Sequence, residues 1–186
     1  MAGQKFLKNM KKSEFIFKNE RVNIYKIKDC REYRKLLKNG EIDKIKKLAY
    51  FKSTKHNLIT NKGLERIARV LAGNVNLSIV EIAPSICAIG DGTGTHTASS
   101  TQLFSEKYRK YVSSRESYQN KFLILSHYLP EECTGQFTEE GIFIAGDVET
   151  ANSGVLLSVI ALSQSEGNKT NTNALIIERL FTLSSS

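Results

Sequence analysis

The sequence predicts a mainly β fold: an antiparallel β-sandwich of the jelly-roll type, preceded by one amphipathic helix and by a basic N-terminal arm that is helical or irregular. Two observations predict this fold. Short apolar or alternating runs follow Gly73 and are separated by clusters of turn residues, as in antiparallel sheets. Most of these runs have no helix-length amphipathic stretch between them, which argues against parallel βαβ units.

The length and composition predict one main core. A chain of 186 residues with 40% apolar residues can bury one sizeable core, with an arm attached to it. We therefore expect two parts. Residues 1–55 form the basic N-terminal arm or a small helical segment, and residues 56–186 form the helix and the β-sandwich.

The predicted arm has little regular pattern. Residues 5–18 mix charged and apolar side chains without a period, which indicates a segment that orders only against a partner. Residues 29–37 have helical spacing, with Asp29 as a cap and Asn39-Gly40 as a stop. Residues 41–51 fit either one or two helical turns or, over Leu48 to Lys52, a strand.

The clearest local pattern is HNLITNKGLERIARVLAGN, which begins at His56. Leu64, Ile67, Ala68 and Leu71 recur at the spacing of one helix face, with charged residues on the other face. Thr60 or Asn61 supplies the N-cap, and Gly73 stands where a helix ends. We expect the apolar stripe of this helix to pack on the sheet that follows.

The strands of the sandwich follow this helix along the chain. Their apolar residues supply the leading core candidates, which are Phe122, Ile124, Ile142, Phe143, Leu156, Leu175, Ile177 and Phe181. The predicted strands are Ile79 to Ala83, Ile86 to Ile89, Lys107 to Ser114, Lys121 to Tyr128, Gly141 to Ala145, Val155 to Leu162 and Ala174 to Leu183.

Charge is distributed unevenly along the chain. Residues 1–70 contain 20 lysines and arginines against 7 acidic residues, whereas residues 71–186 contain 7 against 12. The net charge of +8 is therefore the sum of +13 on residues 1–70, the front half, and −5 on residues 71–186, the back half. Such a basic half suits docking on an acidic protein or binding to nucleic acid. The residues predicted to bind a partner are Lys44, Lys46, Lys47, Lys52 and Lys55.

The stretch IGDGTGTHTASSTQL, from Ile89 to Leu103, is rich in glycine and hydroxyl residues, as many ligand-binding loops are. Its residue spacing, however, matches no ligand-binding motif. No lysine follows the glycines before Lys107, so it is not a P-loop, and the glycine spacing does not match a dinucleotide fingerprint. Asp91 is a single acidic ligand, too few for calcium. We expect a connection between strands, in which the glycines permit positive φ and the threonine and serine hydroxyl groups can bond to the backbone.

No pattern for catalysis, metal or cofactor is present. The three histidines and three cysteines lie on separate segments without ligand spacing, and no serine stands in a GxSxG motif. Adjacent carboxylates at Glu131-Glu132 and Glu139-Glu140 are typical of solvated turns. We predict no catalytic residue, no metal and no cofactor. A carbohydrate-acting enzyme is the alternative, and it would need a carboxylate pair that faces one groove.

The segments indicate neither membrane insertion nor secretion. The longest apolar runs, Phe122 to Leu125 and Val155 to Leu162, are much shorter than the ~20 residues of a spanning helix. The N-terminus has basic residues but no apolar core of a signal peptide. We expect a soluble protein that is synthesised in the cytosol and has no membrane partner.

The order of five segments resembles a known family. These are HNLITNKGLERIARVLAG, ICAIGDGTGTHTASSTQLFSEKYRKYV, FTEEGIFIA, SGVLLSVIALS and Lys169 with ALIIERLFTL. In this order they resemble a recurrent structural protein of tailed bacteriophages and phage-tail-like particles. The resemblance covers roughly Tyr50 to Leu183. Glu106 and Arg109 stand at an acid and an arginine of the motif, and it remains open whether they pair, because Lys107 and Tyr108 between them are bulky.

The resemblance implies an assembly role without catalysis. Such proteins are similar to tail-fibre, baseplate or collar components of a virion, so we expect a non-enzymatic structural protein in the tail. Its partners would be other virion proteins, and it would form a homo-oligomer in a ring or fibre complex after synthesis in the host bacterial cytoplasm. The alternatives are a capsid-associated decoration or head-fibre protein, and a nucleic-acid-binding module that uses the basic arm.

Overall fold

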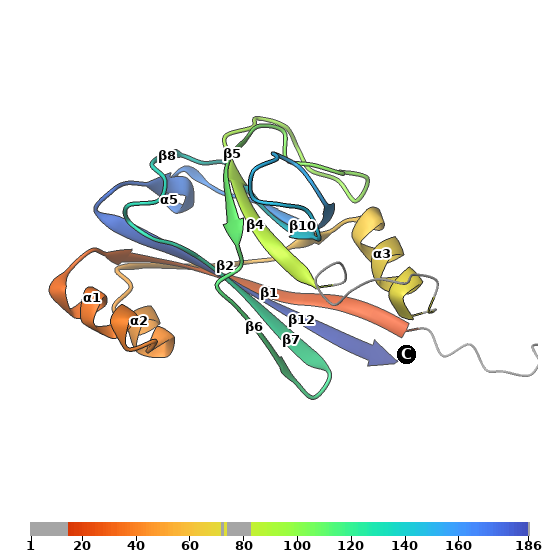
Figure 1. Ribbon diagram of the computed structural model, residues 1–186, viewed down its shortest axis with the longest axis horizontal. Helices are drawn as coiled ribbons and strands as arrows, with labels where there is room; N and C mark the ends of the chain where they lie inside the picture. Colours follow the sequence, from red (N-terminus) through yellow and green to blue (C-terminus); the bar gives the residue numbers. More distant parts are fainter. Residues whose placement is uncertain (1–14, 72, 74–82, 186) are drawn as a thin grey trace, which may run out of the picture.

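The computed structural model describes residues 15–71, residue 73 and residues 83–185. Two five-stranded antiparallel sheets pack together as a sandwich, as the sequence predicts (Figure 1). The first sheet has the order β2 (Phe51–Lys55), β1 (Phe15–Lys28), β12 (Asn173–Ser185), β7 (Lys121–Tyr128), β6 (Ser114–Tyr118). The second has the order β3 (Leu58–Ile59), β10 (Val155–Ala161), β9 (Glu139–Ile144), β4 (Pro84–Gly90), β5 (Glu106–Tyr111).

The short elements lie around the two sheets. Helices α1 and α2 lie at one end of the molecule and α3 lies beside the second sheet (Figure 1). Their bounds are Arg31–Lys38 for α1, Ile42–Lys47 for α2, Asn61–Leu71 for α3 and Gln164–Gly167 for α5. The small pair of β8 (Gly135–Gln136) and β11 (Asn168–Lys169) completes the described fold.

In the described part of the chain, the buried apolar residues form three clusters. The largest lies between the sheets and includes Ile124, Ile142 and Ile177. A second, around Tyr33, Ile45 and Ile176, lies between the first sheet and the helices α1 and α2. A third lies on the outer face of the second sheet, around Leu103, Phe143 and Leu156. Seven predicted core residues are at most 1% exposed: Ile124, Ile142, Phe143, Leu156, Leu175, Ile177 and Phe181. The eighth, Phe122, is half-buried and stacks on Phe181, with 4.6 Å between the ring centroids.

Strand β1 is the main difference from the sequence-based expectation. Its residues fall within the predicted arm, yet β1 pairs with β12 on one side and with β2 on the other. Val22, Ile24 and Lys26 are all buried on alternate positions of the strand. The Lys26 ammonium donates to the Ser165 carbonyl at 2.9 Å, so a lysine occupies a buried position. That lysine hides the period-two pattern in the sequence, and residues 15–55 contribute two strands to the sandwich.

The two helices of the predicted arm form against the first sheet. The helix expected over residues 29–37 is present as α1, and Gly40 just beyond it has φ of +69°. Asp29 does not cap this helix but accepts two hydrogen bonds from Arg34 at 2.6 Å. For residues 41–51 both alternatives are realised in turn: α2 is helical, and a strand starts at Phe51.

Helix α3 forms as predicted but presents a different face. Thr60 caps it, since its hydroxyl accepts the Gly63 N–H at 3.0 Å. Gly63 is buried against Leu157 of β10, and Ile67 packs on the core between the sheets. Leu64 and Leu71 are 39% and 67% exposed. The helix is turned so that its glycine faces the sheet, and the predicted stripe is only partly buried.

The remaining strands match the expected segments closely, except around residue 112. Strands β4, β7, β9, β10 and β12 occupy predicted runs, while residues 79–82 of the first predicted strand lie outside the described residues. The run predicted from Lys107 to Ser114 instead ends at Tyr111, and the chain then crosses to the other sheet. There it forms β6, an edge strand that the sequence pattern does not reveal.

Candidate partner-binding surface

The five lysines predicted to bind a partner lie on α2 and β2, but they are not equivalent. Lys44, Lys47 and Lys52 are exposed, whereas Lys46 and Lys55 are partly buried. The Lys46 ammonium lies 2.6 Å from the Glu178 carboxylate and 2.8 Å from that of Asp43. Burial lowers the pKa of Lys46, but its hydrogen bonds to the two carboxylates outweigh this and raise the pKa above its ordinary value.

Lys55 is likewise engaged within the molecule. Its ammonium lies 2.5 Å from the Glu166 carboxylate and donates to the Ala161 carbonyl at 2.6 Å. Glu166 is 5% exposed and also accepts the Ser53 hydroxyl. Lys55 thus ties the edge of the first sheet to α5, so it stabilises the fold. Among the five lysines, Lys44, Lys47 and Lys52 are the ones exposed to a partner.

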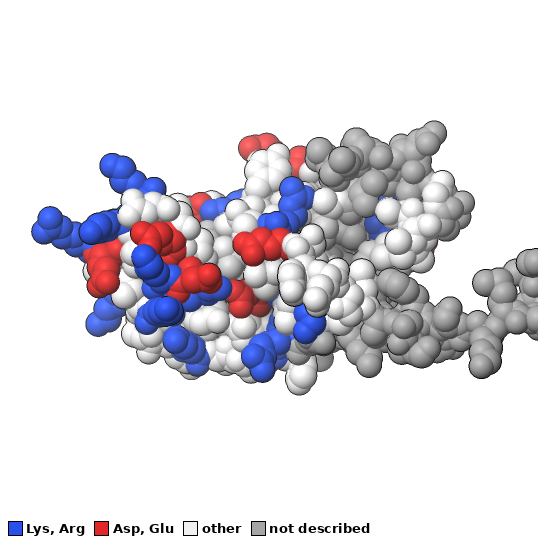
Figure 2. All heavy atoms as spheres, turned by 90° about the horizontal axis from the view of Figure 1, so that it is seen from below, with Lys and Arg blue, Asp and Glu red and all other residues white. Residues whose placement is uncertain are grey.

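Further cations extend this exposed surface. Lys28, Arg31, Lys35 and Lys38 are exposed on the end of β1 and on α1. Tyr50, which is 52% exposed, lies beside the Lys28 ammonium, 6.0 Å from ring centroid to nitrogen. Figure 2 shows many lysine and arginine side chains at this end of the molecule, with acidic side chains among them. We call the exposed set Lys28, Arg31, Lys35, Lys38, Lys44, Lys47 and Lys52 the basic face.

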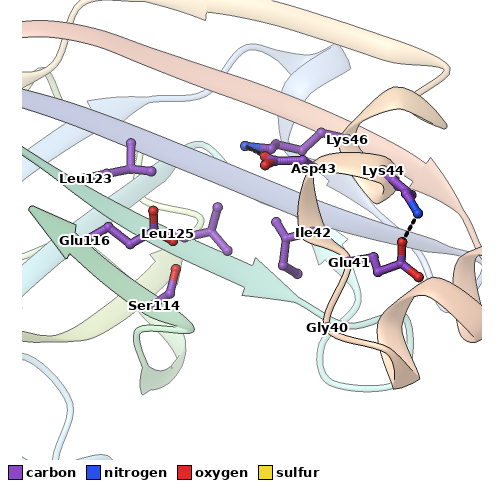
Figure 3. Close-up of a pocket in the computed structure, with 10 residues that line it drawn as sticks. All are labelled: Gly40, Glu41, Ile42, Asp43, Lys44, Lys46, Ser114, Glu116, Leu123 and Leu125. Atoms are coloured by element: carbon purple, nitrogen blue, oxygen red, sulfur yellow. Dashed lines mark ion pairs between the residues drawn. The ribbon is translucent and has the colours of Figure 1, made fainter. Parts of the chain in front are cut away.

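A groove borders the basic face where α2 meets β6 and β7. Its volume is about 470 Å³. Figure 3 shows Ile42 of α2 and Leu125 of β7 on its walls, with Glu116 of β6 at the other side. Lys44 and Lys46 line the same groove, and Lys44 forms an ion pair with Glu41. The sequence predicted the two lysines, but not the groove that they line, whose walls combine charged side chains with Ile42, Leu123 and Leu125.

Many carboxylates of the acidic back half are engaged inside the molecule. Glu106 pairs with Arg109, Glu140 with Arg179, and Glu132 with Lys110. Glu166 and Glu178 pair with Lys55 and Lys46 of the front half, as described above. The uneven charge of the sequence is therefore partly neutralised by long-range contacts in the fold. The basic face keeps its exposed positive charge.

The glycine stretch connects β4 to β5, as predicted, but its glycines serve another purpose than expected. Gly90, Gly92 and Gly94 are not among the described residues with positive φ. A Cβ on Gly92 would lie 2.4 Å from the Phe104 Cβ and 2.6 Å from a Glu139 carboxylate oxygen. These glycines are required by close packing. The expectation of positive φ is wrong at these three positions.

Glu139 organises this loop. One carboxylate oxygen accepts the N–H groups of Gly92 and Ser105 at 3.2 and 2.8 Å. The other accepts the N–H of Phe104 at 3.0 Å and lies 2.6 Å from His96 Nε2. Both side chains of the His96–Glu139 pair are nearly fully buried. A single carboxylate thus fastens two ends of a fifteen-residue connection, which the sequence pattern could not show.

A serine, a histidine and a carboxylate are linked here as in a catalytic triad: Ser100 contacts His96, and His96 contacts Glu139. The Ser100 hydroxyl lies 3.3 Å from His96 Nδ1. However, the same hydroxyl accepts the Thr97 N–H at 3.0 Å, as in a local turn. The four hydrogen bonds to Glu139 hold the loop itself. The arrangement therefore supports a structural role for the histidine better than a catalytic one.

The Glu106–Arg109 pair, left open by the sequence, forms in the structure. Arg109 Nε lies 2.7 Å from the Glu106 carboxylate, and both side chains are almost completely buried. Arg109 also donates to the carbonyls of Asp147 and Thr150. Glu106 accepts the Asn152 N–H at 2.9 Å. The pair therefore fixes the loop between β9 and β10.

The adjacent carboxylates do not form a pair in one groove. Glu139 and Glu140 point to opposite faces of β9: Glu139 to the glycine loop, and Glu140 to Arg179 between the sheets. Glu131 accepts hydrogen bonds from Arg34, while Glu132 pairs with Lys110. All four carboxylates are engaged by cations or by backbone N–H groups, which is the arrangement expected of structural rather than acid–base residues.

Within residues 15–71 and 83–185 there is no group of three or more histidine, cysteine or acidic side chains that could hold a metal ion. Nor does this part of the chain contain a helix long and apolar enough to cross a membrane. Comparisons of the chain with family models, with curated proteins and with solved structures give no match.

Proposed function

We propose that this chain is a non-enzymatic structural component of a bacteriophage virion, located in the tail as a fibre-attachment, baseplate or collar piece. It acts by protein–protein assembly, in a homo-oligomeric ring or fibre complex with other virion proteins. The observation that carries the proposal is that the motifs of the family resemblance pack against one another. Thr60 of the first motif donates its N–H to Leu157 of the fourth at 3.0 Å.

The second and third motifs join the same cluster. Asn61 N–H donates to the Ala98 carbonyl of the glycine loop at 2.7 Å. Glu139 of the third motif fastens that loop, and Thr138 N–H donates to the Gly90 carbonyl at 2.8 Å. The residues that carry the resemblance thus have mutually supporting structural roles. This favours a shared fold and assembly role over a shared reaction.

The basic face supplies the surface for assembly in this proposal. Its seven exposed cations lie on α1, on α2, on β2 and at the end of β1. An acidic surface on a neighbouring virion protein would complement it. Charged residues at a rim steer association and fix orientation, whereas Ile42, Leu123 and Leu125 in the adjacent groove offer apolar contact area.

A quantitative mass-spectrometric inventory of purified particles tests the proposal. We expect this chain in the particle in a fixed, multiple copy number relative to the major tail proteins. Particles separated into heads and tails distinguish the tail assignment from a capsid decoration or head-fibre protein. Absence of the chain from purified particles would reject the structural role.

Nucleic-acid binding is the second candidate, and the basic face with the exposed Tyr50 is the observation that favours it. Lysines and arginines can neutralise phosphates, and an exposed tyrosine ring can stack on a base. Such binding would weaken by orders of magnitude between ~50 and ~200 mM salt. Electrophoretic mobility shifts with single- and double-stranded DNA at low salt would decide, and undetectable binding would remove this candidate.

A further inference from the structure

Strand β6 has a free edge. It pairs with β7 and with no second strand among the described residues. The two-residue turn Gln119-Asn120 joins the strands and places Tyr118 opposite Lys121. Hydrogen-bonded and non-hydrogen-bonded pairs alternate along an antiparallel hairpin, so Arg115 and Ser117 direct their N–H and C=O groups away from β7. These groups are available to another strand.

Hollows lie on both sides of this edge. On the face covered by α2 is the groove described above, with Ile42, Leu123 and Leu125 on its walls. A second hollow, of about 170 Å³, is lined by Pro84, Phe122 and Ile124. A third, of about 260 Å³, lies at the tip of the hairpin. An added strand directs alternate side chains to opposite faces, so it would place side chains over the first two hollows at once.

The charges of β6 disfavour pairing with a second copy of itself. If a two-fold axis joined two copies through their β6 edges into one continuous sheet, the two β6 strands would run antiparallel. The α2-covered faces of both sheets would then lie on the same side. The register that pairs all five residues then places the two Glu116 carboxylates directly opposite each other. Like charges in that position are destabilising, a common protection of edge strands. The free edge therefore suits a different sequence.

We propose that β6 accepts an extended segment of another protein, which joins the first sheet as an antiparallel sixth strand. Arg115 and Glu116 are exposed on opposite faces of the edge and define its charge preference. The segment carries an acidic residue opposite Arg115, a basic residue opposite Glu116 and apolar residues beside them. This inference depends on the free edge and its hollows, and it holds whether or not the protein is a virion component.

A pair of capped synthetic peptides tests the proposal. The first has Val-Thr-Lys-Glu-Val at its centre, which places lysine opposite Glu116 and glutamate opposite Arg115. The second exchanges these two residues. In an NMR titration of the full chain, we expect the first peptide to shift the amide signals of Arg115 and Ser117. The exchanged peptide should bind about tenfold more weakly, because two favourable cross-strand pairs become like-charge pairs.

Matched variants make the test decisive. The double substitution Arg115→Glu with Glu116→Lys should reverse the preference between the two peptides. Ser117→Pro removes an N–H of the free edge and should abolish binding of the first peptide, whereas Ser117→Thr should retain it. Proline is tolerated on an edge strand where the N–H faces outward. Should Ser117→Pro fail to fold, the charge-exchanged variant still decides. No binding of the first peptide at millimolar concentration, or no reversal by the charge exchange, would overturn the proposal.

Discussion

At the scale of single residues, the function of a charged side chain here depends on what surrounds it. Glu139 illustrates this, because its carboxylate accepts three backbone N–H groups and lies beside His96. A carboxylate in a turn cluster is usually solvated, and the sequence predicts that outcome for Glu139. Its actual role arises because β9 directs it toward a loop that comes more than thirty residues earlier in the chain.

We predict that Glu139→Gln lowers the free energy of unfolding by about 2–3 kcal/mol. The amide keeps one acceptor oxygen but turns an NH₂ group toward backbone donors, and hydrogen bonds to charged groups contribute about 1.5–3 kcal/mol each. Urea denaturation measures the change. Glu149→Gln, on an exposed turn, is the control and should have little effect. A change below about 0.5 kcal/mol for Glu139→Gln would contradict the assigned role.

The Lys55–Glu166 pair predicts a pH dependence of stability. Burial raises the pKa of Glu166, but hydrogen bonds from Lys55, Ser163 and Ser53 outweigh this and lower it from 4.5 to about 2. A depressed pKa in the folded state contributes stability above the unfolded value, and this stability is lost as the pH falls from about 4.5 toward 2.

Comparison with Glu166→Gln isolates this contribution. We expect the difference in unfolding free energy between the native chain and the variant to be constant above about pH 5. It should shrink steadily as the pH falls from about 4.5 toward 2, because the unfolded native chain takes up a proton at Glu166 in this range while the folded chain keeps the carboxylate ionised. Urea denaturation over this range measures it. A difference that is independent of pH would show that Glu166 is not held ionised by Lys55.

At the scale of elements, α3 shows how one small residue sets the orientation of a helix. Its N-cap and its length follow from the sequence, but its buried face does not. Gly63 brings the helix backbone against β10, and this contact leaves Leu64 and Leu71 exposed. Apolar periodicity alone would have placed those leucines on the sheet. The close approach of the helix backbone to β10 at Gly63 turns another face of the helix to the sheet instead.

We predict that Gly63→Ala destabilises the protein by about 1–2 kcal/mol, although alanine favours helices. The new Cβ would lie 2.7 Å from the Leu157 Cα and 2.8 Å from its carbonyl oxygen, both backbone atoms that cannot rotate away. Overpacking costs about 1–3 kcal/mol, and the gain in helix propensity is about 1 kcal/mol. Arg69→Ala, on the exposed face of the same helix, is the control in thermal unfolding. An increase in stability for Gly63→Ala would contradict the contact.

At the scale of the whole molecule, the charge that a partner meets differs from the charge of the sequence. Carboxylates of the back half pair with Lys46 and Lys55 of the front half, so the charges of these two lysines are neutralised within the molecule. Lys35, Lys47 and Lys52 remain exposed on the basic face. In the proposed assembly role, docking through this face should therefore depend on the exposed cations and not on the two paired ones.

We predict that replacing Lys35, Lys47 and Lys52 together by glutamate prevents incorporation into the particle while the chain still folds. The expected shift in unfolding free energy is within about 1 kcal/mol, since the side chains are exposed. Complementation with the variant gene, followed by quantification of the chain in purified particles, measures incorporation. A control with Lys62, Arg69 and Lys107 changed to glutamate carries the same charge change elsewhere. Equal incorporation of both variants would exclude the basic face from assembly.

The sequence by itself determined the parts of this protein that depend on local pattern. Alternating runs with turn clusters specified the sandwich, all of its inner strands except β1, and most of its core, because side chains alternate between the faces of a strand. The capped helix α3 was specified in the same way. The sequence offered Thr60 or Asn61 as its N-cap, and Thr60 is the residue that caps it.

Only the tertiary structure decided the rest. Strand β1 is held between β2 and β12, and the buried Lys26 that hides its pattern is satisfied by a carbonyl 139 residues away. Whether Lys46, Lys55 or Glu139 is available to a partner likewise depends on groups remote in sequence. The physical reason is the same in each case. A buried polar group needs a hydrogen-bonding partner, and the amino-acid sequence does not show which distant group the fold brings to it.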